Sequence, residues 1–355
     1  MKGLYTEDSV DVECKMTVKV IDLFCGAGGL THGLQLAGLD VVAGIDLEGE
    51  CRFPYERNNK SKFIEQDIAR VTKEDLLELY GDASIKVLAG CAPCQPFSKY
   101  TQGKDKAEDK KWPLLYEFER LIREVYPEIV TMENVPDVTK HKVYDDFFNS
   151  LIDLGYKVWA SKVDCVEYGI PQNRVRHVLL ASKFGNIELV KREDIQLKTV
   201  KDVIGNLPPL KDGEADKTDV LHRASKLNPI NKQRIIYSVP GGTWKDWPEE
   251  LVAACHLKSS GKGYASVYGR MSWDKPSPTI TTLCYGFGNG RFGHPVQNRA
   301  ISLREAALLQ TFPMDYAFVE DGSKFVMKSI GKMIGNAVPV ELGRVIGQSI
   351  KQHLS

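Results

Sequence analysis

An apolar run, a cluster of glycines and a helical pattern follow one another near the start of the chain, and they constrain its fold most. Thr17–Phe24 has the composition of a buried strand, Cys25–Leu30 supplies the glycines, and Thr31–Gly38 has helical spacing. This order is typical of the first half of a nucleotide-binding βαβ unit. Thr31 takes the place of the third glycine of the dinucleotide fingerprint, which disfavours a dinucleotide-dependent oxidoreductase. Close packing of the helix on the strand would also explain the glycines.

Further apolar runs recur along the first half of the chain and alternate with segments of helical spacing. The alternation predicts an α/β fold built around a mainly parallel sheet. The expected strands are Val41–Ile45, Phe63–Ile68, Ile85–Ala89, Glu128–Met132, Lys157–Cys165 and Arg176–Ser182, and the expected helices include Trp112–Tyr126 and Phe147–Leu154.

Acids lie at the ends of two of these strands, at the edge where an open α/β sheet binds its ligands. Asp46 ends the second strand, where a carboxylate suits the hydroxyls of a ribose, and Asp67 is placed to accept from an adenine amino group. Leu47 can pack on the face of the adenine. Each acid alone is more often a helix cap or a solvated turn. Because one ligand explains both acids and the glycine turn, we expect a cofactor that contains adenosine.

The segment Gly90–Ser98 places a cysteine between two prolines, directly after an apolar run. Proline fixes its own φ and restricts the residue before it, so Pro93 and Pro96 hold Cys94 on a stiff loop beyond the end of a strand. We interpret Cys94 as a covalent nucleophile. The alternatives are a buried structural cysteine and a zinc or redox pair with Cys91. No second ligand pair has comparable spacing, so no metal is expected.

An acid and two arginines are the remaining candidates in this half of the chain. Glu133 follows the strand Glu128–Met132 and is expected on the same rim of the sheet as Cys94. Arg174 and Arg176 point to one face if they begin a strand. Paired arginines can bind phosphate, orient a carbonyl or favour a thiolate, although a surface salt bridge would also account for them.

Length and composition limit the other possibilities. The 355 residues suffice for a large domain and a smaller one, and the formal net charge of zero gives no global signature of nucleic-acid binding. Eight scattered cysteines indicate reduced thiols in a cytoplasmic protein, and no apolar run is long enough to span a membrane. From about Phe184, turn residues and interleaved basic and aromatic residues predict a loop-rich second domain with a candidate nucleic-acid surface.

Three later segments carry specific expectations. Arg270–Thr282 is expected to form a strand that organises the small domain, and Ser302 is expected to cap an amphipathic helix together with Glu305. Gly335–Val340 is expected to open a helix that runs to His353 and returns to the glycine turn, because its small residues suit close approach.

Five short motifs occur in one order along the chain: Asp22–Gly29, Pro93–Gln95, Glu133–Val135, Gln172–Arg176 and Gly335–Pro339. This ordered set closely resembles the motifs of the DNA (cytosine-5)-methyltransferase family of bacterial modification enzymes, from about Val18 to the C-terminal helix. The resemblance implies a Rossmann-like S-adenosylmethionine-dependent methyltransferase sheet, formed by residues 1–186 plus 300–355, and a small target-recognition domain, formed by residues 187–299.

The resemblance also implies a role for each matching residue. Those expected to bind S-adenosylmethionine are Phe24, Gly26, Gly28, Gly29, Leu30, Asp46, Leu47, Asp67, Ile68, Asn336 and Val338. The expected catalytic residues are Cys94, Glu133, Arg174 and Arg176, and the expected substrate-binding residues are Pro93, Gln95, Ser98, Asn134 and Gln172. The expected substrate is double-stranded DNA. The enzyme would act as a monomer in a restriction-modification system whose endonuclease acts separately.

The implied chemistry suits these residue types. Addition of a thiolate at C6 of cytosine makes C5 nucleophilic, a glutamic acid can protonate N3, and the target base must leave the stack. Two alternatives are a tRNA methyltransferase and a catalytically inactive binding module. The Cys-Phe-Thr segment of the tRNA branch is absent from the recognition region, and the cysteine, the glutamate and both arginines are present.

Overall fold

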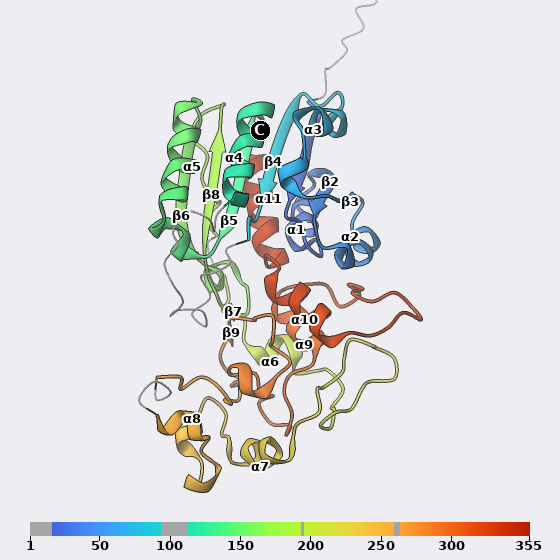
Figure 1. Ribbon diagram of the computed structural model, residues 1–355, viewed down its shortest axis with the longest axis vertical. Helices are drawn as coiled ribbons and strands as arrows, with labels where there is room; N and C mark the ends of the chain where they lie inside the picture. The colour runs from blue at the N-terminus through green and yellow to red at the C-terminus, as the bar shows by residue number, and fades with distance from the viewer. Residues whose placement is uncertain (1–15, 94–112, 193–194, 259–262) are drawn as a thin grey trace, which may run out of the picture.

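A seven-stranded, mostly parallel sheet forms the larger part of the molecule (Figure 1). The computed structural model describes residues 16–93, 113–192, 195–258 and 263–355. The strands of the sheet are β1 Val18–Leu23, β2 Asp40–Asp46, β3 Lys62–Glu65, β4 Ile85–Gly90, β5 Ile129–Asn134, β6 Lys157–Asp164 and β8 Val175–Ser182. This confirms the α/β fold and each expected strand of the first half.

The strand order β3-β2-β1-β4-β5-β8-β6 changes direction between β1 and β4. The neighbours from β3 to β5 are parallel, and β8 runs antiparallel to both β5 and β6. In an open sheet of this kind, ligands bind beyond the carboxyl ends of the strands where the order reverses. The topology therefore places a binding site near the ends of β1 and β4.

Helices cover both faces of the sheet, and an apolar core lies between the sheet and the helices on each face. The helices α1 Gly29–Leu36 and α11 Val340–His353 pack on one face, and α3 Lys73–Tyr80, α4 Pro113–Val125 and α5 Lys142–Asp153 pack on the other. A short helix, α2 Arg52–Asn58, follows β2. Both faces of the central strands are buried, which explains why these strands are continuous apolar runs rather than alternating ones.

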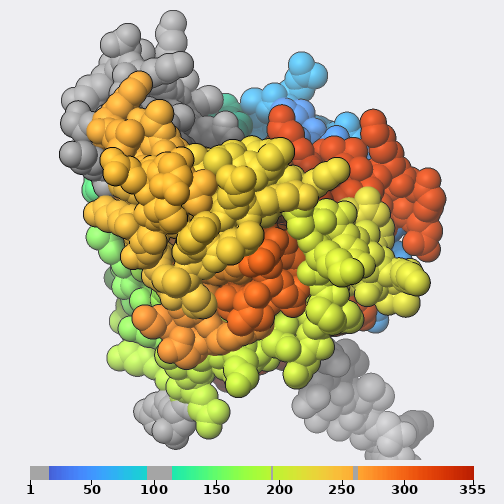
Figure 2. Space-filling view, turned by 90° about the horizontal axis from the view of Figure 1, so that it is seen from below, coloured from blue at the N-terminus to red at the C-terminus, as the bar shows by residue number. Residues whose placement is uncertain are grey.

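Most of the described residues between 195 and 336 form a smaller, loop-rich region below the sheet in Figure 1. Its helices are α6 Val200–Ile204, α7 Pro229–Tyr237, α8 Ala254–Leu257, α9 Leu303–Leu309 and α10 Met327–Asn336, and a two-stranded ribbon joins β7 Gln172–Asn173 to β9 Ser277–Pro278. Figure 2 shows this end of the molecule, where the yellow and orange segments form most of the surface.

The prediction of a strand over Arg270–Thr282 was wrong in extent, because only Ser277–Pro278 is a strand. Two prolines in this segment lack the N–H that a longer ladder needs. Arg270 organises the region through its side chain instead. Its guanidinium donates to the carbonyl oxygens of Ser238 (2.7 Å), Ile235 (2.7 Å) and His294 (2.8 Å).

Ser302 and Glu305 form the expected capping box at the start of α9. Ser302 Oγ accepts from the amide of Glu305 at 3.1 Å, and Glu305 Oε2 accepts from the amide of Ser302 at 2.7 Å. The helix shares its apolar core with α6 and α10 rather than with the sheet. Ile187 and Leu189, by contrast, are buried in the sheet core beside α11.

The return of the C-terminal helix to the glycine turn is confirmed, although the helix begins later than expected. Val340, the last residue of the segment Gly335–Val340, is the first residue of α11, whereas Gly335 and Asn336 end α10. A Cβ on Gly33 would meet the backbone of Val340 and Arg344. The close approach of α1 and α11 thus requires glycine at this position. None of the helices in the described ranges is long and apolar enough to cross a bilayer.

Candidate active site at the carboxyl ends of the strands

The glycine turn after β1 performs two different tasks. A Cβ on Gly26 would meet no atom within 4 Å, whereas one on Gly28 would meet the amide of Asn59 and one on Gly29 would meet the carbonyl of Val338. Gly26 therefore faces open space, and Gly28 and Gly29 permit tight packing within the protein. Close packing within the protein thus accounts for glycine at positions 28 and 29. A cofactor could contact these two residues through their N–H and C=O groups.

Phe24 adopts a left-handed backbone conformation at the end of β1, with φ of 59°. Its amide donates to the carbonyl of Ile45 on β2 at 2.8 Å, which fixes the start of the turn. Left-handed conformations are uncommon for residues other than glycine and cluster at functional sites. The turn is thus held in one shape by the two neighbouring strands.

Asp46 lies at the end of β2 and contacts the turn. Its Oδ2 accepts from the amide of Gly26 at 2.8 Å, and its Oδ1 accepts from the amide of Glu48 at 2.9 Å. Burial raises the pKa of this carboxyl, and the two amides oppose the rise. Leu47, beside it, is 66 % exposed, which leaves a large apolar side chain uncovered next to the carboxylate.

The other predicted cofactor residues differ in how their side chains lie. Asp67 caps the turn after β3, where its Oδ1 accepts from the amide of Ala69 at 3.0 Å. Leu30, Ile68 and Val338 have side chains buried in the sheet cores. A cofactor would therefore meet these three residues through their backbone. Asn336 is exposed at the end of α10.

Glu133 is the second-last residue of β5, and its carboxyl group lies between an arginine and a thiol. Arg176 Nε is 2.9 Å from Glu133 Oε1, and Cys91 Sγ donates to Glu133 Oε2 at 2.9 Å. Glu133 is only 3 % exposed. The structure thus brings two of the predicted catalytic residues, Glu133 and Arg176, into direct contact. An ion pair so well shielded from water differs from the surface salt bridge that the sequence left open.

Arg174 lies on the same short segment as Arg176 but has different partners. Its terminal nitrogens donate to the carbonyls of Ile280 (3.1 Å) and Ala337 (3.2 Å). Burial, together with the positive charge of Arg176, lowers the pKa of the Arg174 guanidinium to about 9, so it remains charged at neutral pH. Its Nε has no hydrogen-bond partner among the described residues.

The side-chain amides of Asn134 and Gln172 form hydrogen bonds within the protein. Asn134 Nδ2 donates to the carbonyl of Ala92 at 3.2 Å, which ties the end of β5 to the segment that follows β4. Gln172 is fully buried: its Nε2 donates to Gln310 Oε1 at 2.8 Å, and its Oε1 accepts from the amide of Ile280 at 2.8 Å. A direct contact between the Gln172 side chain and a substrate does not fit this arrangement.

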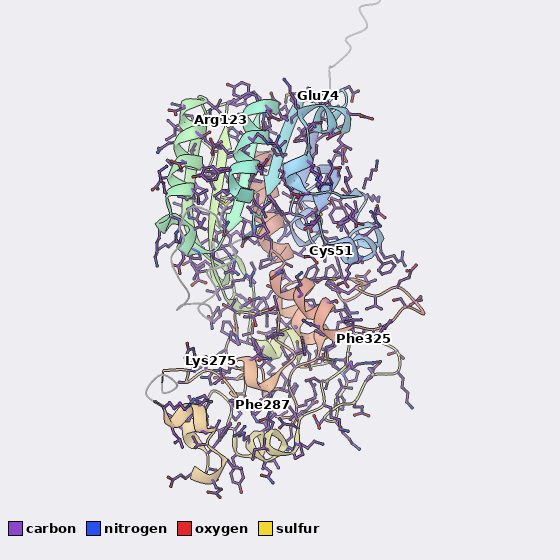
Figure 3. The ribbon with its side chains drawn as sticks, in the orientation of Figure 1. Cys51, Glu74, Arg123, Lys275, Phe287 and Phe325 are labelled. Atoms are coloured by element: carbon purple, nitrogen blue, oxygen red, sulfur yellow. The ribbon has the colours of Figure 1, made fainter. Side chains whose placement is uncertain are left out.

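The segment that leads to the predicted nucleophile begins at this rim. Pro93 is exposed and is the last described residue of the segment, while Cys94, Gln95 and Ser98 lie outside the described residues. Figure 3 labels Cys51, which follows β2 on the side of the sheet that faces the small region, and Arg123, which lies at the opposite end of the sheet. The carboxyl ends of the parallel strands, and the site with them, therefore face the small region.

Two groups at this rim were not anticipated from the sequence. The sequence suggested Cys91 only as a partner for Cys94. Its position directly after β4, however, places it beside the end of the neighbouring strand β5. Asp22 is buried in β1, where its Oδ2 accepts from Thr31 Oγ1 at 2.7 Å and its Oδ1 has no partner among the described residues. Burial raises the pKa of Asp22 to about 7. The sequence feature that could have indicated Asp22 is its position as the first residue of the motif Asp22–Gly29.

Comparison with known proteins places this geometry in one family. The family model described as C-5 cytosine-specific DNA methylase matches residues 18–352. The chain is 55 % identical over 344 residues to the Type II methylase M.HgiDII of Herpetosiphon aurantiacus, covering 96 % of each chain. It is 32 % identical to the Type II methyltransferase M.Eco47II of Escherichia coli, covering 93 % of this chain and 78 % of that one.

Solved structures share the fold. A crystal structure described as a DNA modification methyltransferase encoded within an E. coli prophage superposes with a TM-score of 0.73 at 21 % identity, covering 95 % of this chain and 99 % of that one. The Dnmt2 methyltransferase of S. pombe superposes with a TM-score of 0.59 at 18 % identity, covering 95 % of this chain and 98 % of that one.

The chain belongs to the C-5 cytosine-specific DNA methylases. It is accordingly a DNA (cytosine-5)-methyltransferase, and the reaction class expected from the ordered motifs is confirmed.

Proposed function

We propose that this enzyme methylates C5 of a flipped-out cytosine in a specific duplex DNA sequence by way of a covalent bond between Cys94 and C6. The observation that carries the proposal is the pairing of Glu133 with Arg176 at the end of β5. This pair lies beside the carboxyl end of β4, from which the chain leads to Cys94. A nucleophile from one strand end and an acid from the next are what addition to the pyrimidine ring requires.

The described residues fit S-adenosylmethionine as the cofactor. Gly26 faces open space, Leu47 is exposed and apolar, and each Asp46 oxygen keeps an acceptor position beyond the amide that it already binds. Asp46 would hold the ribose hydroxyls, Leu47 the adenine face and Asp67 the adenine amino group. The cofactor supplies an electrophilic methyl group. The remaining contacts would come from Phe24, Gly28, Gly29, Leu30, Ile68, Asn336 and Val338.

The protein's own groups would activate the base. A free thiol has a pKa of about 8.5, and nearby arginine charge favours the thiolate that adds to C6. As the new S–C6 bond forms, Glu133 protonates N3, so that negative charge leaves the ring and C5 gains nucleophilic character. Arg174 and Arg176 would hold the O2 edge of the base and the segment that carries Cys94. After methylation, water takes the C5 proton, and the electrons of the C5–H bond form the C5–C6 double bond and expel the Cys94 thiolate. The N3 proton returns to Glu133, which regenerates the acid.

The small region would select the DNA target. We assign target recognition to residues 187–299, with Ile187 and Leu189 packed on the catalytic side. Extrusion of the cytosine costs about a few kcal/mol, which contacts to the duplex must offset. Pro93, Gln95, Ser98 and Asn134 would line the path of the base. Because the curated relatives are Type II enzymes, we assign this one to the modification half of a restriction-modification system, acting as a monomer apart from its endonuclease.

Substitution of the nucleophile tests the proposal. Cys94→Ala is expected to abolish methyl transfer to duplex DNA while S-adenosylmethionine still binds, as measured by calorimetry. DNA that contains 5-fluorocytosine is expected to trap the wild-type enzyme covalently, because the fluorine cannot leave as a proton does. Turnover by Cys94→Ala, or no adduct under conditions in which ordinary DNA is methylated, would refute the mechanism. Bisulfite sequencing of DNA from expressing cells would then give the target sequence.

A further inference from the structure

Cys91 and Glu133 are neighbours across two parallel strands. Gly90 pairs with Met132 at the ends of β4 and β5, so the next residue of each strand extends from the same face of the sheet. The result is the 2.9 Å hydrogen bond from Cys91 Sγ to Glu133 Oε2. The amide of Cys91 also donates to the carbonyl of Leu23 on β1 at 3.3 Å, which anchors its backbone to the central strand.

We propose that Cys91 is a positioning residue for Glu133 in methyl transfer. Arg176 attracts Oε1 and Cys91 binds Oε2, so the two contacts together oppose rotation of the carboxyl group. A carboxylate oxygen has two acceptor positions, and the thiol uses one of those on Oε2. The other position stays available for the proton that goes to N3 of cytosine. The inference rests on the role proposed above for Glu133.

The character of the thiol suits this task. A neutral S–H is a weaker donor than an ammonium or a guanidinium, so it orients the carboxylate without neutralising it. Arg176 thus supplies the only full positive charge in contact with Glu133 among the described residues. Since Glu133 is buried, water competes little for Oε2, and a single hydrogen bond there has a larger orienting effect than at the surface.

A pair of Cys91 variants tests the inference. Cys91→Ala removes the donor with little change in volume, and Cys91→Ser keeps a donor at nearly the same position. We expect kcat for methylation to fall roughly three- to tenfold in Cys91→Ala, the effect of losing one orienting hydrogen bond, and to recover in Cys91→Ser. KM for DNA and for S-adenosylmethionine and the midpoint of thermal unfolding should stay near the wild-type values, because the contact orients a catalytic group.

Glu133→Gln separates this inference from the function on which it rests. If Glu133→Gln is inactive but Cys91→Ala keeps wild-type kcat, the positioning role is wrong and the proposed function stands. If Glu133→Gln keeps wild-type kcat, the proposed role of the acid is itself wrong. A loss in Cys91→Ala that Cys91→Ser does not restore, accompanied by a lower unfolding midpoint, would assign Cys91 to packing and overturn the inference.

Discussion

The buried ion pair between Arg299 and Glu305, which lies on α9, allows a quantitative test of how the small region is held together. Arg299 is fully buried, and its terminal nitrogens donate to both carboxylate oxygens of Glu305 at 2.7 Å. Burial alone raises the pKa of Glu305, but the hydrogen bonds and the charge of Arg299 outweigh it and hold the pKa below its ordinary value. We consider Arg299→Met, which keeps most of the side-chain length and removes the guanidinium.

The expected loss follows from what remains around the carboxylate. The amide of Ser302 still donates to Glu305. The imidazole of His294 does not replace the cation at pH 8, because burial lowers its pKa, which is about 4 in the wild-type protein. Two hydrogen bonds to a charged group, at about 1.5–3 kcal/mol each, agree with the roughly 3–5 kcal/mol found when one partner of a buried pair is removed. We therefore expect the free energy of unfolding to fall by about 3–5 kcal/mol at pH 8.

The loss should depend on pH in a specific direction. Without Arg299, the pKa of the Glu305 carboxyl in the folded protein rises above its unfolded value, so the variant gains stability from proton uptake at low pH and loses it as pH rises. Urea denaturation should thus show a smaller deficit at pH 5 than at pH 8. In the double variant Arg299→Met/Glu305→Gln, part of the loss at pH 8 should be recovered because no buried charge is left unpaired.

Two outcomes would refute this reasoning. A loss below about 1 kcal/mol for Arg299→Met at pH 8 would mean that the ion pair contributes little beyond its own desolvation cost. A double variant no more stable than Arg299→Met would place the loss in side-chain packing rather than in the unpaired carboxylate.

Other positions give independent predictions. The pKa of Asp22, raised by burial, means that between pH 4 and about 7 the folded protein holds a proton that the unfolded chain releases. Wild-type stability is therefore lost as pH rises through this window, and the advantage of Asp22→Asn in thermal unfolding should grow there by up to about 1.4 kcal/mol per pH unit; a constant difference would contradict the assignment. Gly33→Ala forces α11 away from α1 and should cost about 1–3 kcal/mol in urea denaturation, whereas Gly263→Ala, which faces open space, should cost less than about 0.5 kcal/mol; equal effects would count against close helix packing.

Much of the sheet could be predicted from the sequence because its signals are local. Each central strand is an apolar run bounded by turn residues, and the glycine turn fixes the order of the first strand and helix. The capping box of Ser302 and Glu305 also lies within four consecutive residues. Such patterns depend on short-range geometry, which one sequence displays directly.

What could not be predicted depends on contacts between distant segments. Nothing local in Gln172 shows that its amide binds Gln310 and Ile280. The helix α10 Met327–Asn336 was missed although Met327, Ile330 and Ile334 have helical spacing. The packing of Gly28 against Asn59 joins two segments about 30 residues apart, and no local pattern in either segment indicates it. The contact of Cys91 with Glu133 lies between these two cases. It joins distant segments, but the register of two neighbouring parallel strands would have predicted it.

The packing of α11 against α1 and the central strands has a consequence for biosynthesis. Residues such as Leu342, Val345 and Ile346 fill the core on one face of the sheet, yet the ribosome makes them after every strand of that sheet. A nascent chain therefore carries an uncovered apolar layer until translation of this helix is complete, which makes it a substrate for chaperones and vulnerable to aggregation. Ribosome-stalled chains that end before Val340 should accordingly be protease-sensitive and unable to methylate DNA.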